Sequence, residues 1–137
     1  MTDNNKLTIS IYSFGFHKSG IPEDESGNNG GFVFDCRALP NPGREAHFAR
    51  KTGLDREVID YLERENTVHQ FLHHTLALIK ISAKNYRERK FSHLMVSFGC
   101  TGGQHRSVYC AEKIAAHLKD LGYNVRVTHI DKPDFEL

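Results

Sequence analysis

The sequence predicts a single α/β domain with a mostly parallel sheet flanked by helices. Short runs of β-forming apolar residues alternate with longer segments in which apolar residues recur at helical spacing. At 137 residues, with 39% hydrophobic and 26% charged side chains, the chain has the size and composition of one globular domain. Strands separated by helices imply right-handed crossovers, so most strands should run parallel.

The N-terminal third predicts two strands joined by a loop. Residues 6–14, KLTISIYSF, place apolar side chains at every second position, as a strand does. Residues 19–31 are rich in glycine, asparagine and acidic residues without periodicity, so we expect a loop with a mobile tip. A second strand is predicted over residues 32–39, stopped by Pro40 and Pro42.

Two helices are predicted in the middle of the chain. Asp55 is a candidate N-cap for a helix over residues 56–64, which carries an apolar stripe. Thr67 and Gln70 have the spacing of a capping box, ahead of a helix that reaches about Tyr86.

The C-terminal part predicts a strand, a helix and a strand. Residues 93–99 are almost continuously apolar, which is typical of a strand covered on both faces. A helix over residues 107–121 should end at Gly122, and a last strand should span residues 125–131 before a short tail, residues 131–137. In open parallel sheets ligands bind beyond the carboxyl ends of the strands, so the polar residues there should face one crevice.

Composition excludes several classes of partner. The formal net charge of +1 gives no bulk attraction to nucleic acid or membrane, and no segment resembles a signal peptide or a membrane span. Cys36, Cys100 and Cys110 lack metal-ligand spacing and indicate reduced thiols in a cytoplasmic protein. His69 and His73 stand four apart without a third ligand, so we expect neither a metal nor another cofactor.

Residues 98–107, FGCTGGQHRS, are the strongest functional signal. A strand, a glycine-rich turn and a helix start would direct free backbone N–H groups and the positive end of a helix dipole at one point. Gly102 and Gly103 permit close approach of a ligand to the backbone, and Arg106 can donate two hydrogen bonds to phosphate oxygens.

We therefore expect a phosphorylated small molecule, or free phosphate or sulfate, as the ligand of this loop. Neither the P-loop motif nor G-x-G-x-x-G is present, which disfavours ATP or a dinucleotide bound in those modes. The residues expected to bind the ligand are Cys100, Thr101, Gly102, Gly103, Gln104, His105, Arg106 and Ser107, with His17, Asp35, Arg37 and Asn41 from neighbouring strand ends.

Two alternatives stay open at this site. Asp35 and Arg37 either pair with each other, or Arg37 extends toward the ligand.

Cys100, Arg106 and Ser107 also fit the C-x-x-G-x-x-R-S spacing of cysteine-dependent phosphatases, in which the thiolate attacks phosphorus. Those enzymes usually carry histidine where this chain has Gly99, and no aspartate is singled out as the general acid. Catalysis by Cys100 is thus the alternative to binding.

Four stretches resemble the C-terminal domain of the RapZ family of RNase adapter proteins. They are YSFGFHKSGIP, FVFDCRALPNPG, KTGLDREVIDYL and above all GCTGGQHRSVY, in the same order and at similar separations. The resemblance implies an α/β domain likened to part of phosphofructokinase, a pocket that senses an amino-sugar phosphate, and binding of small regulatory RNA. By position, Thr101, Gly102, His105 and Arg106 match the pocket-forming part of the motif.

The chain departs from the family in three places. Nothing in these 137 residues resembles the N-terminal nucleotide-binding domain of the family or its Walker motif, so we expect a C-terminal domain on its own. Gly43 stands where the family often has a histidine, and the tail lacks the family's arginines and lysines. RNA binding would then depend on Arg87, Arg89 and Lys90, which alternatively are an ordinary solvated helix end. A protein partner and self-association also stay open.

Overall fold

The computed structural model describes residues 6–135 and contains a four-stranded sheet in which every neighbouring pair is parallel. The strands are β1 (Thr8–Gly15), β2 (Phe32–Asp35), β3 (His93–Cys100) and β4 (Asn124–His129), in the spatial order β2-β3-β1-β4. The predicted α/β class with a parallel sheet is confirmed.

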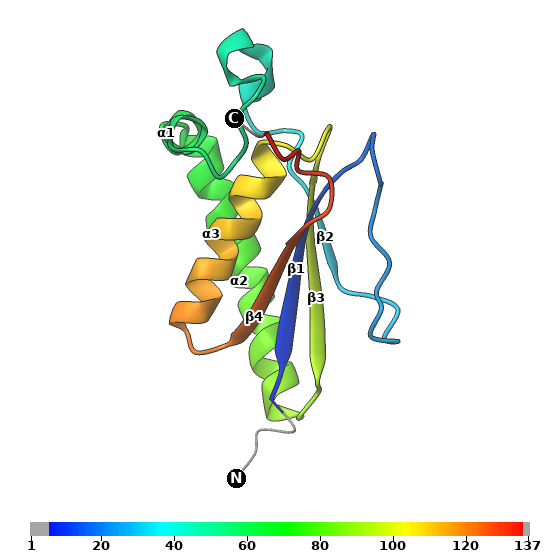
Figure 1. Ribbon diagram of the computed structural model, residues 1–137. Helices are drawn as coiled ribbons and strands as arrows, with labels where there is room; N and C mark the ends of the chain where they lie inside the picture. The colour runs from blue at the N-terminus through cyan, green and yellow to red at the C-terminus, as the bar shows by residue number, and fades with distance from the viewer. Residues whose placement is uncertain (1–5, 136–137) are drawn as a thin grey trace.

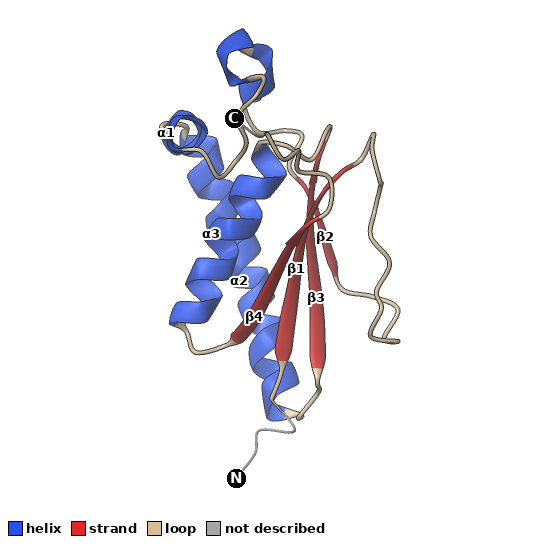
Figure 2. Cartoon of the chain, in the orientation of Figure 1, coloured by secondary structure: helices blue, strands red, loops and turns tan. Residues whose placement is uncertain are grey.

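Three helices cover one face of this sheet, as Figure 1 shows. They are α1 (Arg56–Glu63), α2 (Asn66–Glu88) and α3 (Arg106–Asp120), preceded by two short 3₁₀ turns, η1 (Pro42–Arg44) and η2 (Ala46–Phe48). The steps from β2 to β3 and from β3 to β4 run in the same direction across the sheet, so right-handed crossovers place their helices on the same face. The step from β1 to β2 runs the other way, and its connection, residues 16–31, contains no helix (Figure 2).

The core lies between the sheet and the helices. Alternate residues of the central strands, such as Ile9, Ile11, Val96 and Phe98, are fully buried in one cluster with the apolar sides of the helices. β3 is also buried on its other face, where Gly31 of the β1–β2 connection lies against the Met95 backbone. The prediction that this strand is covered on both sides is confirmed.

β2 is shorter than predicted. The carboxylate of Asp35 accepts a hydrogen bond from the backbone N–H of Arg37 at 2.9 Å, and the N–H of Leu39 donates to the carbonyl of Cys36 at 3.1 Å. These local bonds turn the chain after Asp35, four residues before the predicted end at residue 39.

The predicted capping box is wrong. α2 already begins at Asn66, so Thr67 and Gln70 lie within its first turns, and its N-cap residue, Glu65, makes no side-chain capping bond. Asp55 does precede α1, but its carboxylate accepts from the Thr52 N–H at 2.7 Å instead of capping the helix. The predicted C-cap of α3 is correct, since Gly122 has a φ of 92°.

No helix within residues 6–135 combines the length and the apolar character that crossing a lipid bilayer requires.

Candidate anion-binding site

The anion loop, Thr101–Arg106, leads from β3 into the first residue of α3. It lies at the end of the sheet where the carboxyl ends of the strands meet (Figure 1). None of the backbone N–H groups from Thr101 to His105 donates a hydrogen bond to an acceptor in the described part of the chain. The first turn of α3 follows directly, and its dipole adds positive potential at the same place. A run of free amides at a helix N-terminus is suited to an oxyanion.

The two glycines of the loop have different roles. Gly103 has a φ of 75°, and a Cβ there would lie 2.7 Å from the backbone nitrogen of Gly15 and 2.8 Å from the Cβ of Asp131. Glycine is therefore required for the loop to pack against the end of β1. A Cβ on Gly102 would meet no atom within 4 Å, so this part of the loop faces open space.

Arg106 is buried, with 5% of its surface exposed. Its Nη1 donates to the backbone carbonyls of Arg37 at 2.9 Å and Leu39 at 3.0 Å, while its Nε is buried without an acceptor among residues 6–135. The guanidinium is thus only partly available for the predicted fork onto phosphate, since Nη1 already fastens the segment after β2 to α3. A buried N–H without a partner is costly, so Arg106 places an uncompensated positive charge beneath the loop.

The side chains of Gln104 and His105 point into the protein. Gln104 Nε2 donates to the carbonyls of Ala49 at 2.9 Å and Lys51 at 2.8 Å. His105 Nε2 lies 2.9 Å from the carbonyl of Phe48. Both were expected to contact the ligand, but these bonds hold the end of η2 and the residues after it against the anion loop. For Gln104, the backbone N–H is the group that stays available to an anion.

Burial favours the neutral form of the His105 imidazole. Burial lowers the pKa of His105, and the nearby carbonyls of Phe48 and Lys51 oppose this shift only in part. Because Nε2 carries the proton donated to Phe48, Nδ1 is left as an acceptor. A Cβ on Gly43 would lie 3.6 Å from this Nδ1.

Cys100 faces inward. Its Sγ lies 3.1 Å from Ser107 Oγ and accepts a bond from the Ser107 N–H at 3.4 Å. Both residues are buried, and only 3% of the surface of Cys100 is exposed. A nucleophilic thiolate needs access to its substrate, and this thiol is instead used to join β3 to α3.

Asp35 and Arg37 form an ion pair, the first of the two alternatives. Arg37 Nε and Nη2 donate to the two carboxylate oxygens of Asp35 at 2.9 and 2.7 Å, and the guanidinium lies 3.9 Å from the centre of the Phe16 ring. Hydrogen bonds from Arg37 hold the pKa of Asp35 below its usual value. Asn41, also an expected ligand residue, accepts from the Gly43 N–H at 2.9 Å and caps η1.

The end of β1 borders the anion loop. The backbone N–H of His17 donates to the Thr101 carbonyl at 3.0 Å, and its imidazole is exposed.

Asp131 was not among the expected ligand residues, yet its carboxylate accepts from the Gly15 N–H at 2.8 Å and from Ser19 Oγ at 2.6 Å. Burial raises the pKa of Asp131, but these hydrogen bonds together bring it below its usual value. Its position at the C-terminal end of the predicted last strand, residues 125–131, was the sequence signal for it.

Comparison with known proteins decides the family. The model of the RapZ C-terminal domain matches residues 7–133. The chain belongs to the RapZ C-terminal domain family. It is 41% identical to a "Nucleotide-binding protein" of Glaesserella parasuis over 93% of this chain, and 40% identical to one of Thermotoga neapolitana over 96%. It is also 41% identical, over 90% of its length, to the "RNase adapter protein RapZ" of Yersinia enterocolitica. The matches cover 43%, 44% and 42% of these relatives, so the chain spans less than half of their length.

In this RapZ-family domain, the three residues expected to bind RNA are far from the anion loop. Arg87, Arg89 and Lys90 lie at the C-terminal end of α2, beside the end of the sheet at which the strands begin (Figure 1). The guanidinium of Arg87 lies 4.3 Å from the Tyr123 ring centre, and that of Arg89 lies 4.3 Å from Phe91. The residues expected to bind a phosphorylated ligand at the anion loop and the residues expected to bind RNA therefore lie on two separate surfaces.

Proposed function

We propose that this domain binds a phosphorylated small molecule at the anion loop and acts as a sensing module. The observation that carries the proposal is the run of unbonded N–H groups from Thr101 to His105, next to the buried positive charge of Arg106. Unbonded donors at a helix N-terminus suit the oxygens of a phosphate group. Resemblance to the family makes an amino-sugar phosphate the first candidate ligand.

The phosphate group alone would bind weakly. Hydrogen bonds from arginine contribute about 1.5–3 kcal/mol and a helix terminus up to about 2 kcal/mol, which together give roughly millimolar affinity. The rest of the ligand must supply further contacts. We propose that one of them is a hydrogen bond from a ligand hydroxyl or ammonium group to His105 Nδ1, the ring nitrogen that faces Gly43 and does not bond to Phe48.

The test is a thermal-shift and calorimetric series with inorganic phosphate and a panel of sugar phosphates. We expect the melting temperature to rise with phosphate, and one sugar phosphate to bind more tightly than phosphate itself. Arg106→Met should lose binding, whereas Arg126→Met, at an exposed position of β4, should keep it. Gly102→Val, which enters open space, tests the loop without removing a buried contact. Full binding by both loop variants would contradict the proposal.

Binding is favoured over phosphatase chemistry because the Cys100 thiol is buried against Ser107. The domain should therefore not hydrolyse an aryl phosphate at high protein concentration, and Cys100→Ser should keep phosphate binding. Turnover that disappears in Cys100→Ser would establish the phosphatase alternative instead.

An adapter role is the second candidate function, because relatives carry the name RNase adapter protein. The cations that end α2 supply a local basic surface at a distance from the anion loop. RNA binding there should weaken with rising salt and with Arg87→Ala, Arg89→Ala and Lys90→Ala combined. Salt-independent or absent binding would remove this candidate.

A further inference from the structure

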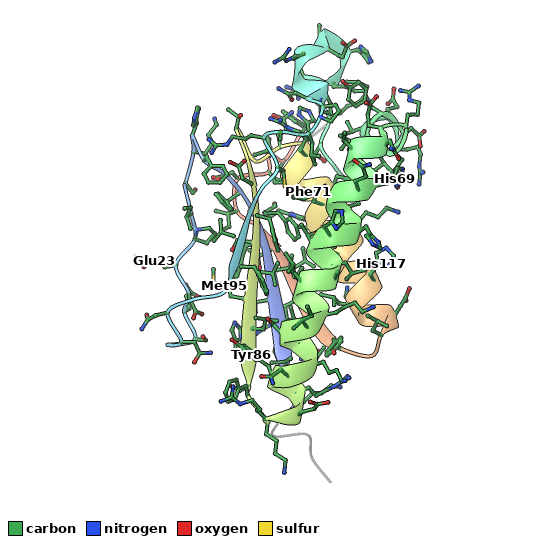
Figure 3. All side chains as sticks on the ribbon, turned by 180° about the vertical axis from the view of Figure 1, so that it is seen from behind. Glu23, His69, Phe71, Tyr86, Met95 and His117 are labelled. Atoms are coloured by element: carbon green, nitrogen blue, oxygen red, sulfur yellow. The ribbon has the colours of Figure 1, made fainter. Side chains whose placement is uncertain are left out.

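A large cavity lies where the strands begin, at the other end of the sheet from the anion loop. Its volume of about 520 Å³ is within the range of ordinary ligand pockets. Its walls are the C-terminal end of α2, the first residues of β3 and the glycine turn of the β1–β2 connection. Figure 3 shows two of the lining residues, Tyr86 on α2 and Met95 on β3. The short β2 leaves this space open, because it begins opposite Val96 and residues 93–95 of β3 have no strand on that side. An unpaired strand edge is therefore part of the cavity wall.

Aromatic rings and cations line the cavity, and none of the described residues in its lining is acidic. The rings of Tyr86 and Phe91 meet edge to face, with their centres 4.9 Å apart. The guanidinium of Arg89 lies 4.3 Å from the centre of the Phe91 ring, which holds this cation beside the cavity. Glu88, the nearest acid along the chain, pairs with a lysine one turn earlier in α2. The lining therefore suits a ligand that combines a flat ring with a negative charge.

The wall formed by the β1–β2 connection is ordered by its own contacts. The carboxylate of Asp24 accepts from the backbone N–H groups of Ser26 and Gly30 at 2.9 and 3.3 Å. Gly31 packs so closely on β3 that a Cβ there would collide with the Met95 carbonyl. The acid of this loop is thus engaged with the loop backbone, and the lining of the cavity stays positive.

Lys90 occupies a position at which the backbone favours glycine. It follows α2 with a φ of 60°, and the N–H of the next residue, Phe91, donates to the Tyr86 carbonyl at 2.9 Å. α3 ends with the same arrangement, but there the left-handed residue is Gly122, with a φ of 92°. A lysine is less stable than a glycine in this conformation. The lysine side chain adds to the cavity wall a positive charge that forms no ion pair with any residue from 6 to 135.

We propose that this cavity binds one unpaired nucleotide of a single-stranded RNA. The base packs on the rings of Tyr86 and Phe91, the open edge of β3 supplies hydrogen-bonding groups to the edge of the base, and Lys90 meets the adjoining phosphate. A paired base is stacked inside its helix, so a duplex meets only the cations outside the cavity. The proposal rests on the RNA-binding candidate above and adds the form of RNA that is recognised.

The test measures the fluorescence anisotropy of a labelled single-stranded oligouridylate of about six nucleotides at constant ionic strength. We expect saturable binding. The affinity should fall at least about fivefold for the same oligomer without its bases, for an RNA duplex of equal length and for Phe91→Leu. Phe135→Leu, an aromatic substitution outside the cavity, should bind like the parent protein. Unlabelled uridine monophosphate has the same base and phosphate, but it should compete more weakly than the oligomer because it meets the cations with a single phosphate.

Lys90→Gly separates binding from folding. The variant should raise the melting temperature, because glycine fits the left-handed conformation, and yet lower the affinity for the oligomer at least about threefold. Lys84→Met removes the same charge at an exposed position of α2 outside the cavity, and should leave the affinity within about twofold of the parent value.

The possible results separate this site from RNA binding in general. Equal affinity for the oligomers with and without bases, or parent affinity in Lys90→Gly, would overturn the nucleotide site and leave RNA binding at the end of α2 intact. Absence of binding by any of these RNAs would remove the RNA-binding candidate together with the site. Uridine monophosphate that competes as well as the oligomer would show a mononucleotide site and contradict recognition of RNA.

Discussion

At the scale of single residues, Arg106 joins two distant parts of the chain. It is the charged side chain whose Nη1 connects the segment after β2 to α3, and its Nε is buried without an acceptor among residues 6–135. From the sequence motif we expected the guanidinium of Arg106 to lie beside the glycine turn. The motif did not predict that two backbone carbonyls would accept hydrogen bonds from its Nη1. Those carbonyls belong to Arg37 and Leu39, almost seventy positions earlier, and backbone acceptors leave no trace in the sequence pattern.

Arg106→Met should lower the free energy of unfolding by about 2–3 kcal/mol, because the carbonyls of Arg37 and Leu39 lose a charged donor in a buried place. Urea denaturation measures the change. Arg126→Met is the matched control and should stay within about 0.5 kcal/mol of the parent protein. An unfolding free energy that Arg106→Met leaves unchanged would show that the arginine has no structural role.

His105 makes stability depend on pH. Its lowered pKa in the folded state means that the unfolded chain binds the proton more readily, so stability is lost as the pH falls below the ordinary imidazole value of 6.5. The parent protein should therefore lose more stability between pH 7 and pH 5 than His105→Gln, whose amide can still donate to Phe48. The lowered pKa values of Asp35 and Asp131 act in a more acidic range, below about pH 4. Equal pH slopes for both proteins would contradict a buried neutral His105.

At the scale of elements, the strand–turn–helix unit around the anion loop was predictable because its signals are local. Glycines, a preceding apolar run and a following helical stripe all lie within about thirty residues. The boundaries were less predictable where side chains bond to nearby backbone, as Asp35 does when it ends β2. The directions of the Gln104 and His105 side chains were not predicted for a different reason. Their partners lie at the end of η2 and just after it, where the backbone has no periodicity from which to predict it.

Gly103→Ala should cost about 1–3 kcal/mol of stability, because the residue has a positive φ and its Cβ would collide with the end of β1. Gly102→Ala is the matched control, one position away and facing open space, and should fold like the parent protein. Denaturation of both variants gives the comparison. Equal stability of the two would mean that the loop does not pack on β1 as described.

At the scale of the whole molecule, the parallel sheet and the convergence of polar strand ends were predicted, whereas the single helical layer was not. The one-sided arrangement follows from the strand order, which periodicity alone does not reveal. Contacts between residues far apart in the sequence connect the strand ends, because the carboxylate of Asp131, two residues after β4, accepts hydrogen bonds from Gly15 at the end of β1 and from Ser19 beyond it.

Asp131→Asn tests this long-range connection. The variant loses charge-assisted hydrogen bonds to the Gly15 and Ser19 N–H groups, so hydrogen exchange at those two amides should become faster. Asp134→Asn, three residues further along the tail, should leave both exchange rates unchanged. Unaltered exchange in Asp131→Asn would contradict a structural role for this carboxylate.

The central claim is that the free amides of Thr101–His105 and the buried Arg106 form an oxyanion site. Its most direct test is a titration of the ¹⁵N-labelled protein with inorganic phosphate, followed through the backbone amide resonances. We predict saturable shifts concentrated at Thr101–His105 and their loss in Arg106→Met. Shifts that are absent, or that fall instead at the cations ending α2, would contradict the claim.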